Sequence, residues 1–421
     1  MMYTIFETFV GAGGSHIGFT KKGFTSVYVN DNVQECLDTL ILNNPKLKDT
    51  AYIDDRSILD VDRETILKKI GLKKKELDVM FGGIVCKGFS LAGERSPNDE
   101  RNYFYHKQIE LTNEIKPKIS IIENVKGILN AKVLSRNTPS KIKKQIDSVW
   151  QDLENYKGQK ADLRKKNKVT KEVEEKGEEL RKKKKKLLGY ITQKRYLISV
   201  MDDIVDTFDK SGYRTKFRVL NTAWYGAATK RERVIIVAVR KDIDIDFKFP
   251  IPKFHNSSIS TRFTGKDLSK LKLKKPVTVG DALAKIDYKK KDIDNEPMNH
   301  LKKTVARFKY IPEGDNVSNH IDKLPDDLKI SSFYSRGNTM RLDRNKPSPT
   351  LVPGHSNFPI HPYEHRSITV REAATITGFP INYKFVGNHT KRCEHVGNAV
   401  PPPLAEAIAE SCIELLKKVK Q

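Results

Sequence analysis

Residues 81–93, FGGIVCKGFSLAG, decide the fold that this sequence predicts, because an apolar segment runs out into glycines there. Residues 77–81 are rich in strand formers, which indicates a buried strand ending at this loop. The loop holds one cysteine, Cys86, with Lys87 beside it. An exposed thiol next to a cation ionises readily, and open α/β sheets bind ligands at the carboxyl ends of their strands. Cys86 is therefore a candidate nucleophile, and a structural cysteine is the alternative.

A second glycine-rich loop follows the first strand-like segment, residues 3–9, and reads VGAGGSHIG over residues 10–18. Glycines at this place let the backbone approach a ligand, and the N-terminus of the following helix favours its negative groups. The next strand-like segment ends at Asp31, where an acidic residue usually binds a ribose diol. The pattern predicts an adenosine-containing cofactor. Asp54 and Asp55 end the third segment and either contact an adenine edge or belong to a polar loop.

Two later strand-like segments place charged residues at their ends. Residues 119–122 lead into Glu123, a carboxylate that acts as an acid if burial raises its pKa. Residues 229–233, TKRER, lead into an apolar strand. Arg231 and Arg233 alternate there, so they point to one face of the strand, as an anion-binding pair would. A solvated strand edge is the alternative.

The composition indicates the class of partner. The 421 residues include 78 Lys and Arg against 53 Asp and Glu, a formal charge of +25. Such an excess is typical of polyanion binding, because each neutralised phosphate releases counterions; a Lys-rich proteome is the alternative. The four cysteines are far apart, which predicts neither a disulfide framework nor a metal site. No apolar run is long enough to cross a bilayer, so we expect a cytoplasmic protein.

Taken together, these segments resemble the motifs of the cytosine-C5 DNA methyltransferase family, of the bacterial or phage restriction-modification type. The resemblance covers both ends of the chain and follows the family's order. Six segments carry it: the cofactor motif at residues 9–14, the nucleophile loop at 82–93, ENV at 123–125, the QxRxR-like 229–233, REAA at 371–374 with GFP at 378–380, and GNAVPP at 397–402.

The resemblance implies an α/β fold, a Rossmann-like sheet with helices on both faces and a smaller irregular target-recognition domain; a helical insertion lies outside the resemblance. It implies DNA (cytosine-5-)-methyltransferase activity with S-adenosyl-L-methionine on double-stranded DNA. In the family's reaction Cys86 would add to carbon 6 of a flipped cytosine, Glu123 would act at ring N3 and the amino group, and Arg231 and Arg233 would hold the base or its phosphate. No metal is needed.

The resemblance also assigns binding residues and partners. It allows a cognate restriction endonuclease that acts on the same site as a further partner, and we expect a monomer. The residues implied for the cofactor are Phe9, Gly11, Gly13, Gly14, Asp31, Asp55, Asn398 and Val400. Those implied for DNA are Lys87, Ser90, Arg336 and Arg341.

Three positions depart from the family's pattern. Val85 and Lys87 replace the usual proline and glutamine beside the cysteine, and Thr229 replaces the usual glutamine. A loop without the proline is less stiff, whereas Lys87 favours the thiolate. A catalytically weak DNA-binding relative therefore stays open. So does a tRNA cytosine-C5 methyltransferase, although the large variable region 241–364 favours a reader of duplex sequence. An amino-group methyltransferase is disfavoured, because the sequence has no (Asp/Asn/Ser)-Pro-Pro-aromatic tetrad.

We divide the sequence into a catalytic domain, 1–240, a target-recognition domain, 241–365, and a C-terminal segment, 366–421, that returns to the catalytic domain. An insertion at about 134–195 interrupts the first. Its apolar residues follow coiled-coil spacing in two series, which predicts a basic helical hairpin rooted near residues 123–125: Ile142, Ile146, Val149, Leu153 and Tyr156, then Val169, Val173, Leu180 and Leu187. The functional interpretation is an arm gripping flanking phosphates, and a solvated insertion or a dimerisation arm is the alternative.

Overall fold

The computed structural model describes residues 3–84, 96–99, 103–255, 271–330, 337–354 and 357–419. The chain divides into two compact units. The first comprises Met1–Gly83, Leu111–Glu123 and Lys216–Gln421, and the second comprises Ile84–Glu110 and Asn124–Thr215. Among the described helices, none has both the length and the apolar character needed to span a membrane.

The first unit is built on a seven-stranded sheet in the order β3-β2-β1-β4-β5-β9-β8. β1 pairs with β2 and β4, β2 with β3, and β4 with β5, all in parallel. The strands are β1 (Tyr3–Thr8), β2 (Phe24–Asn30), β3 (Tyr52–Asp54), β4 (Val79–Gly83), β5 (Ile119–Val125), β8 (Tyr213–Asn221) and β9 (Glu232–Arg240). The parallel-dominated α/β sheet confirms the predicted fold class.

The strand order places a topological switch point between β1 and β4. From β1 the chain moves outward to β2 and β3, and from β4 it moves the other way to β5. Doubly wound sheets bind ligands in the crevice at the carboxyl ends of the strands at such a point. Both glycine-rich loops follow these two strands, so the strand order explains why the candidate site lies here.

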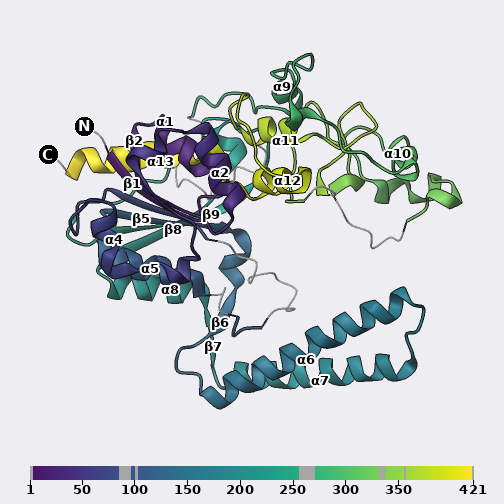
Figure 1. The fold of residues 1–421 in the computed structure, drawn as a ribbon, viewed down its shortest axis with the longest axis horizontal. Helices are drawn as coiled ribbons and strands as arrows, with labels where there is room; N and C mark the ends of the chain where they lie inside the picture. Colours follow the sequence, from purple (N-terminus) through teal and green to yellow (C-terminus); the bar gives the residue numbers. More distant parts are fainter. Residues whose placement is uncertain are drawn as a thin grey trace. The chain divides into compact units, whose positions relative to one another are not determined.

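Helices cover both faces of the sheet in the first unit, with α1 and α13 over one face and α4 over the other (Figure 1). A Cβ at Gly18 of α1 would lie 2.4 Å from the backbone nitrogen of Glu406 in α13, so only glycine permits this close approach. Leu404 and Ile408 of α13 share one core with Ile5 of β1, so the last helix packs on the core of the first strand. The helices here are α1 (Gly14–Lys21), α2 (Gln34–Asn43), α3 (Leu47–Thr50), α4 (Arg63–Lys69), α5 (Phe104–Ile115, which continues from the second unit) and α13 (Pro402–Val419).

The region from 241 to about 400 has short helices joined by long loops. Its core includes Leu342, Phe358 and Phe379, and Asp294 forms a buried ionic centre with Arg392 at 3.0 Å and Arg371 at 3.3 Å. The α-helices are α9 (Val279–Leu283), α10 (Lys302–Phe308), α11 (Val370–Thr377) and α12 (His389–Asn398). Short 3-10 helices in the chain are η1 (Ile58–Asp60), η3 (Lys126–Asn130), η4 (Thr222–Tyr225), η7 (Ile293–Asn295), η8 (Val317–Lys323), η9 (Asp326–Leu328) and η10 (Gly337–Thr339).

The second unit contains a long helical hairpin, α6 (Ser140–Lys165) and α7 (Lys171–Gln193), whose helices lie side by side (Figure 1). β6 (Lys132–Leu134) and β7 (Leu197–Ser199) pair antiparallel at its base, and α8 (Val200–Lys210) follows. The predicted hairpin is therefore present. Its seam contains the expected Ile146, together with Trp150 and Ile191, which the spacing argument did not include.

Candidate active site

The carboxyl ends of β1, β4 and β5 converge on Gly83. A Cβ at Gly83 would lie 3.4 Å from the carbonyl oxygen of Phe9, 3.7 Å from Oε2 of Glu123 and 3.7 Å from Cγ2 of Val400. Gly83 also pairs with Glu123 in the β4–β5 register. Three residues that the sequence assigns to the site, from opposite ends of the chain, are thus within contact range of one backbone position.

The glycine-rich loop after β1 is fixed by Asp31. The backbone N–H of Gly11 donates to Oδ2 of Asp31 at 2.8 Å, and that of Val33 donates to Oδ1 at 3.0 Å. Burial raises the pKa of the Asp31 carboxyl, although both N–H groups act in the opposite direction. Phe9 and Gly11 have φ of 51° and 54°, in the left-handed region that L side chains rarely adopt. The loop therefore has a defined shape.

The C-terminal segment closes over this loop. The Tyr383 hydroxyl donates to the carbonyl oxygen of Ala12 at 2.7 Å. A Cβ at Gly14 would lie 2.1 Å from the carbonyl oxygen of Val400, so any side chain there would displace the segment. Tyr383 was not identified from the sequence, because no local pattern connects it to a loop 371 residues away.

A buried polar cluster also lies at the start of α1, and sequence reasoning missed it. Glu7 of β1 accepts hydrogen bonds from Ser15 at 3.2 Å and from Ser26 at 2.8 Å, and its Oε2 lies 2.8 Å from Nδ1 of His16. All four side chains are buried. The cluster joins β1, β2 and the first turn of α1, and thereby orients the helix that follows the glycine loop. Its sequence signal is a carboxylate inside a strand that is otherwise built of aromatic, Ile and Thr residues.

The loop fits an adenosine-containing cofactor. A Cβ at Gly11 would meet no atom within 4 Å, so open space adjoins the loop there. Asp31 is half-buried and is an acceptor at the end of β2, as a ribose diol requires. Asp55 and Asn398 are both exposed, Asp55 just after β3 and Asn398 at the end of α12.

Glu123 and Arg233 form a buried ion pair. Nε of Arg233 lies 2.8 Å from Oε1 of Glu123, and the two residues are 7% and 6% exposed. Burial raises the pKa of Glu123, against the opposing charges of Arg233 and Arg231. A carboxyl with a raised pKa holds a proton more readily at neutral pH, as an acid must.

Arg231 is buried two residues before Arg233. Its Nη1 donates to the carbonyl oxygen of Leu351 at 3.0 Å, and its Nε has no hydrogen-bond acceptor among the described residues. Burial and the neighbouring Arg233 hold the pKa of Arg231 well below its usual value. A buried donor without an acceptor is costly, so a polar group bound against this nitrogen would gain a hydrogen bond that the fold itself does not supply.

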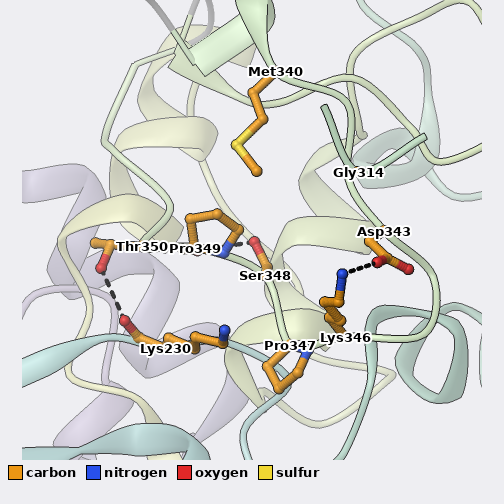
Figure 2. A pocket seen from close by; sticks show the side chains of 9 residues that line it. All are labelled: Lys230, Gly314, Met340, Asp343, Lys346, Pro347, Ser348, Pro349 and Thr350. Carbon is orange, nitrogen blue, oxygen red and sulfur yellow. Dashed lines mark hydrogen bonds and ion pairs between the residues drawn. The ribbon is translucent and has the colours of Figure 1, made fainter. Parts of the chain in front are cut away.

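A pocket of about 400 Å³ lies where the backbone around Lys230 meets residues 346–350 (Figure 2). The backbone N–H of Lys230 donates to the carbonyl oxygen of Ser348 at 2.7 Å, and the backbone N–H of Ser348 donates to the carbonyl oxygen of Ala228 at 2.8 Å. Lys346 pairs with Asp343 at 2.8 Å at the pocket's edge. The TKRER segment is thus joined by backbone hydrogen bonds to the proposed target-recognition region.

The remaining predicted residues divide into two groups. Val85, Cys86, Lys87, Ser90 and Arg336 lie outside the described residues. Arg341 does not fit the DNA-contacting role that the sequence suggests. It is 3% exposed, and its guanidinium donates to the carbonyl oxygens of four residues: Phe308, Ile311, His361 and Glu364. Arg341 is an internal brace of this region, because its donors are directed at backbone.

Known proteins resemble this chain along its whole length. The Type II methyltransferase M.Eco47II of Escherichia coli is 26% identical, over 100% of this chain and 81% of its own. M.NgoFVII of Neisseria gonorrhoeae is 27% identical, over 98% and 86% respectively.

Two solved structures share the fold. One, described as a DNA modification methyltransferase encoded within an E. coli prophage, has 22% identity, a TM-score of 0.57 and 99% coverage of both chains. The other, a Spodoptera frugiperda DNMT2 mutant, has 14% identity, a TM-score of 0.55 and full coverage of both chains. The family model for C-5 cytosine-specific DNA methylases matches residues 3–150 and 189–414, and the chain belongs to that family.

Proposed function

We propose that this protein methylates carbon 5 of a cytosine within a short specific sequence of double-stranded DNA, as the modification enzyme of a type II restriction system. The observation that carries the proposal is the convergence of Phe9, Glu123 and Val400 on Gly83, three residues before Cys86. The relatives named as Type II methyltransferases support the restriction context and, with it, a cognate endonuclease that cuts the same site.

The cofactor that fits the site is S-adenosyl-L-methionine, which supplies an electrophilic methyl group. Phe9, Gly11, Gly13 and Gly14 would provide the loop that approaches it, and Asp31 would accept the ribose hydroxyls. Asp55 would contact the edge of the adenine ring. Asn398 and Val400 would border the site from the C-terminal segment.

Cys86 is the proposed nucleophile. Carbon 5 of cytosine is too weakly nucleophilic to accept a methyl group directly, but addition of the thiolate to carbon 6 makes the ring enamine-like. After transfer, loss of the carbon 5 proton and of the thiolate restores the aromatic ring. The target base reaches Cys86 only when it leaves the stack, at a cost of about a few kcal/mol.

Glu123 and the two arginines would stabilise that addition. Glu123 would donate a proton or hydrogen bond to ring N3, where negative charge develops. Its raised pKa favours the protonated form. Arg233 would hold the carboxyl in place, and the acceptor-free Nε of Arg231 would bind the oxygen of the base or of its phosphate.

We also propose the division into a catalytic domain, 1–240, a target-recognition domain, 241–365, and a returning segment, 366–421. Residues 216–421 belong to the same compact unit as β1–β4, and Arg231 bonds directly to Leu351. These links support a target-recognition region that is anchored to the TKRER segment. A monomer is the proposed state, and sedimentation of the purified protein tests it.

Bisulfite sequencing of plasmid DNA tests the proposal, in cells that express the wild type, Cys86→Ala or Cys36→Ala. We expect protected cytosines in one recurring sequence in the wild type and none in Cys86→Ala. Cys36→Ala is the matched control, because burial raises the pKa of the Cys36 thiol and makes it a poor nucleophile. If no plasmid cytosine is protected in any sample but tRNA cytosines are, the substrate is tRNA and not DNA. Methylation by Cys86→Ala would contradict the covalent mechanism.

A further inference from the structure

The α6–α7 hairpin is where this chain departs from its family. The family model matches up to residue 150 and again from residue 189, so most of the hairpin lies outside the match. The reaction proposed above uses no residue between these two points. The hairpin is nevertheless a well-defined structure, which calls for its own explanation.

The apolar side chains of the hairpin are used within it. Ile146 of α6 packs with Ile191 of α7, and a Cβ at Gly177 would lie 2.1 Å from the Tyr156 hydroxyl oxygen, so the helices run antiparallel in close contact. All hairpin residues are described, and Tyr190 is their one exposed large apolar side chain, at 40%. A coiled-coil dimer needs a second apolar stripe, and this surface offers none.

Charge is balanced at the tip of the hairpin. The tip holds the C-terminal half of α6 and the N-terminal half of α7, which is rich in glutamate. Three lysines there have acidic partners: Lys160 with Glu174 at 2.6 Å, Lys165 with Asp162 at 3.5 Å and Lys171 with Glu175 at 3.7 Å.

Charge is unbalanced in the half nearer the base. Residues 181–186 are six consecutive basic residues, RKKKKK. Two of them have partners: Lys183 lies 3.7 Å from Glu179, and Lys184 lies over the Trp150 ring at 5.3 Å. The basal face, which we define as Lys182, Lys185 and Lys186, is exposed and has no ion pair among the described residues. Lys185 and Lys186 come three and four residues after Lys182, so all three lie toward one side of α7.

The acidic residues of the basal half do not neutralise this face. They are Asp147 and Asp152 of α6. Asp147 accepts two hydrogen bonds from Asn98, both at 3.0 Å, and Asp152 is exposed. Lys141 and Lys144 add exposed positive charge at the same end. They precede Ile146 in α6 and so lie nearer the base than the Ile146–Ile191 contact.

We propose that the basal face binds the sugar–phosphate backbone of duplex DNA outside the sequence that is methylated. Lysines are point charges suited to phosphates, and backbone contacts add affinity without sequence information. The inference rests on duplex DNA as the substrate.

The test compares two triple variants of the full-length protein. Lys182→Gln/Lys185→Gln/Lys186→Gln removes the basal face, and Lys157→Gln/Lys165→Gln/Lys171→Gln removes the same charge from lysines that have acidic neighbours. Glutamine is a good helix former, so circular dichroism is expected to stay unchanged in both. Affinity for a duplex about 30 base pairs long, roughly three DNA turns, is measured by fluorescence anisotropy over a range of KCl concentrations.

We expect the basal variant to bind DNA more weakly. The slope of log K against log salt should also become shallower by up to about 2.7, because each of the three lost phosphate contacts contributes about 0.9. The control variant is expected to change the slope by much less. An unchanged slope in the basal variant, or equal losses in both, would overturn the inference. So would tighter binding of single-stranded RNA through the same lysines, or loss of a dimer in the basal variant. If the wild type binds no DNA at all, the proposed function itself fails.

Discussion

Nε of Arg233 lies 2.8 Å from Oε1 of Glu123, between two side chains that are both more than nine-tenths buried. Removing two charges from water is costly, and the pair's attraction offsets that cost only in part. Burial consequently raises the pKa of Glu123 even with an arginine in contact. A structural ion pair usually lowers the pKa of a carboxyl, so the opposite direction here favours an acid in the reaction.

Glu123→Gln is expected to slow methyl transfer by about 10²- to 10⁴-fold, the usual loss for a general acid. The wild-type rate should fall as the pH rises through the raised pKa of Glu123, because the protonated fraction falls. Glutamine does not titrate, so this alkaline decline should be absent from the variant. Single-turnover rates across pH measure both effects, and an identical decline in the two proteins would assign it to another group.

The same residue predicts how stability depends on pH. Because folding raises the pKa of Glu123, its contribution to the free energy of unfolding is fully present below its ordinary value of 4.5. The contribution is lost as the pH rises through the folded pKa. Urea unfolding at several pH values should therefore show this decline in the wild type and a weaker one in Glu123→Gln.

Arg231→Lys is expected to lower kcat/KM by about 10- to 10³-fold, because lysine keeps the charge but not the fork of donors. Arg240→Lys is the matched control. Arg240 is the last residue of β9, the strand that begins directly after Arg231, and its Nε lies 2.7 Å from Asp242. Steady-state kinetics should leave the control near wild type. A loss of equal size in both variants would indicate damage to β9 rather than to the site.

Gly14→Ala and Gly158→Ala are expected to change stability in opposite directions. A Cβ at Gly14 would meet the carbonyl oxygen of Val400 at 2.1 Å, and such overpacking costs about 1–3 kcal/mol. Gly158 lies in α6 with no atom within 4 Å of a Cβ, so alanine there should stabilise the helix by up to about 1 kcal/mol. Thermal unfolding measures the stability of both variants, and an equilibrium titration measures their affinity for the cofactor. Only Gly14→Ala should weaken cofactor binding.

Arg341→Met is expected to destabilise the fold severely, because four backbone carbonyl oxygens each lose a hydrogen bond from a buried guanidinium. Arg344→Met is the control. Arg344 is exposed, and solvent weakens its two-pronged pair with Glu313 at 2.8 Å, so its loss should lower the melting temperature much less than the loss of Arg341. Differential scanning calorimetry compares them. If Arg341→Met melts like the wild type but binds DNA weakly, the residue contacts DNA after all.

Local patterns in the sequence were sufficient to predict local features of this protein. Each of these features is read from residues close together in the sequence. They are the glycines within residues 11–14, the carboxylate after residues 119–122 and the spacing of Ile142, Ile146 and Val149. Strand ends, tight loops and helical seams follow from such neighbours. The sheet, the loop after β1 and the hairpin were therefore accessible without coordinates.

Only the tertiary structure decided which distant residues meet and which donors face the interior. Val400 lies against Gly83, and Tyr383 bonds to Ala12, because the last segment packs across the sheet. Arginine is a residue type that often contacts DNA, but Arg341 is buried among backbone carbonyl groups. A side chain's type fixes what it can bind, whereas packing between elements far apart in the sequence fixes what it does bind.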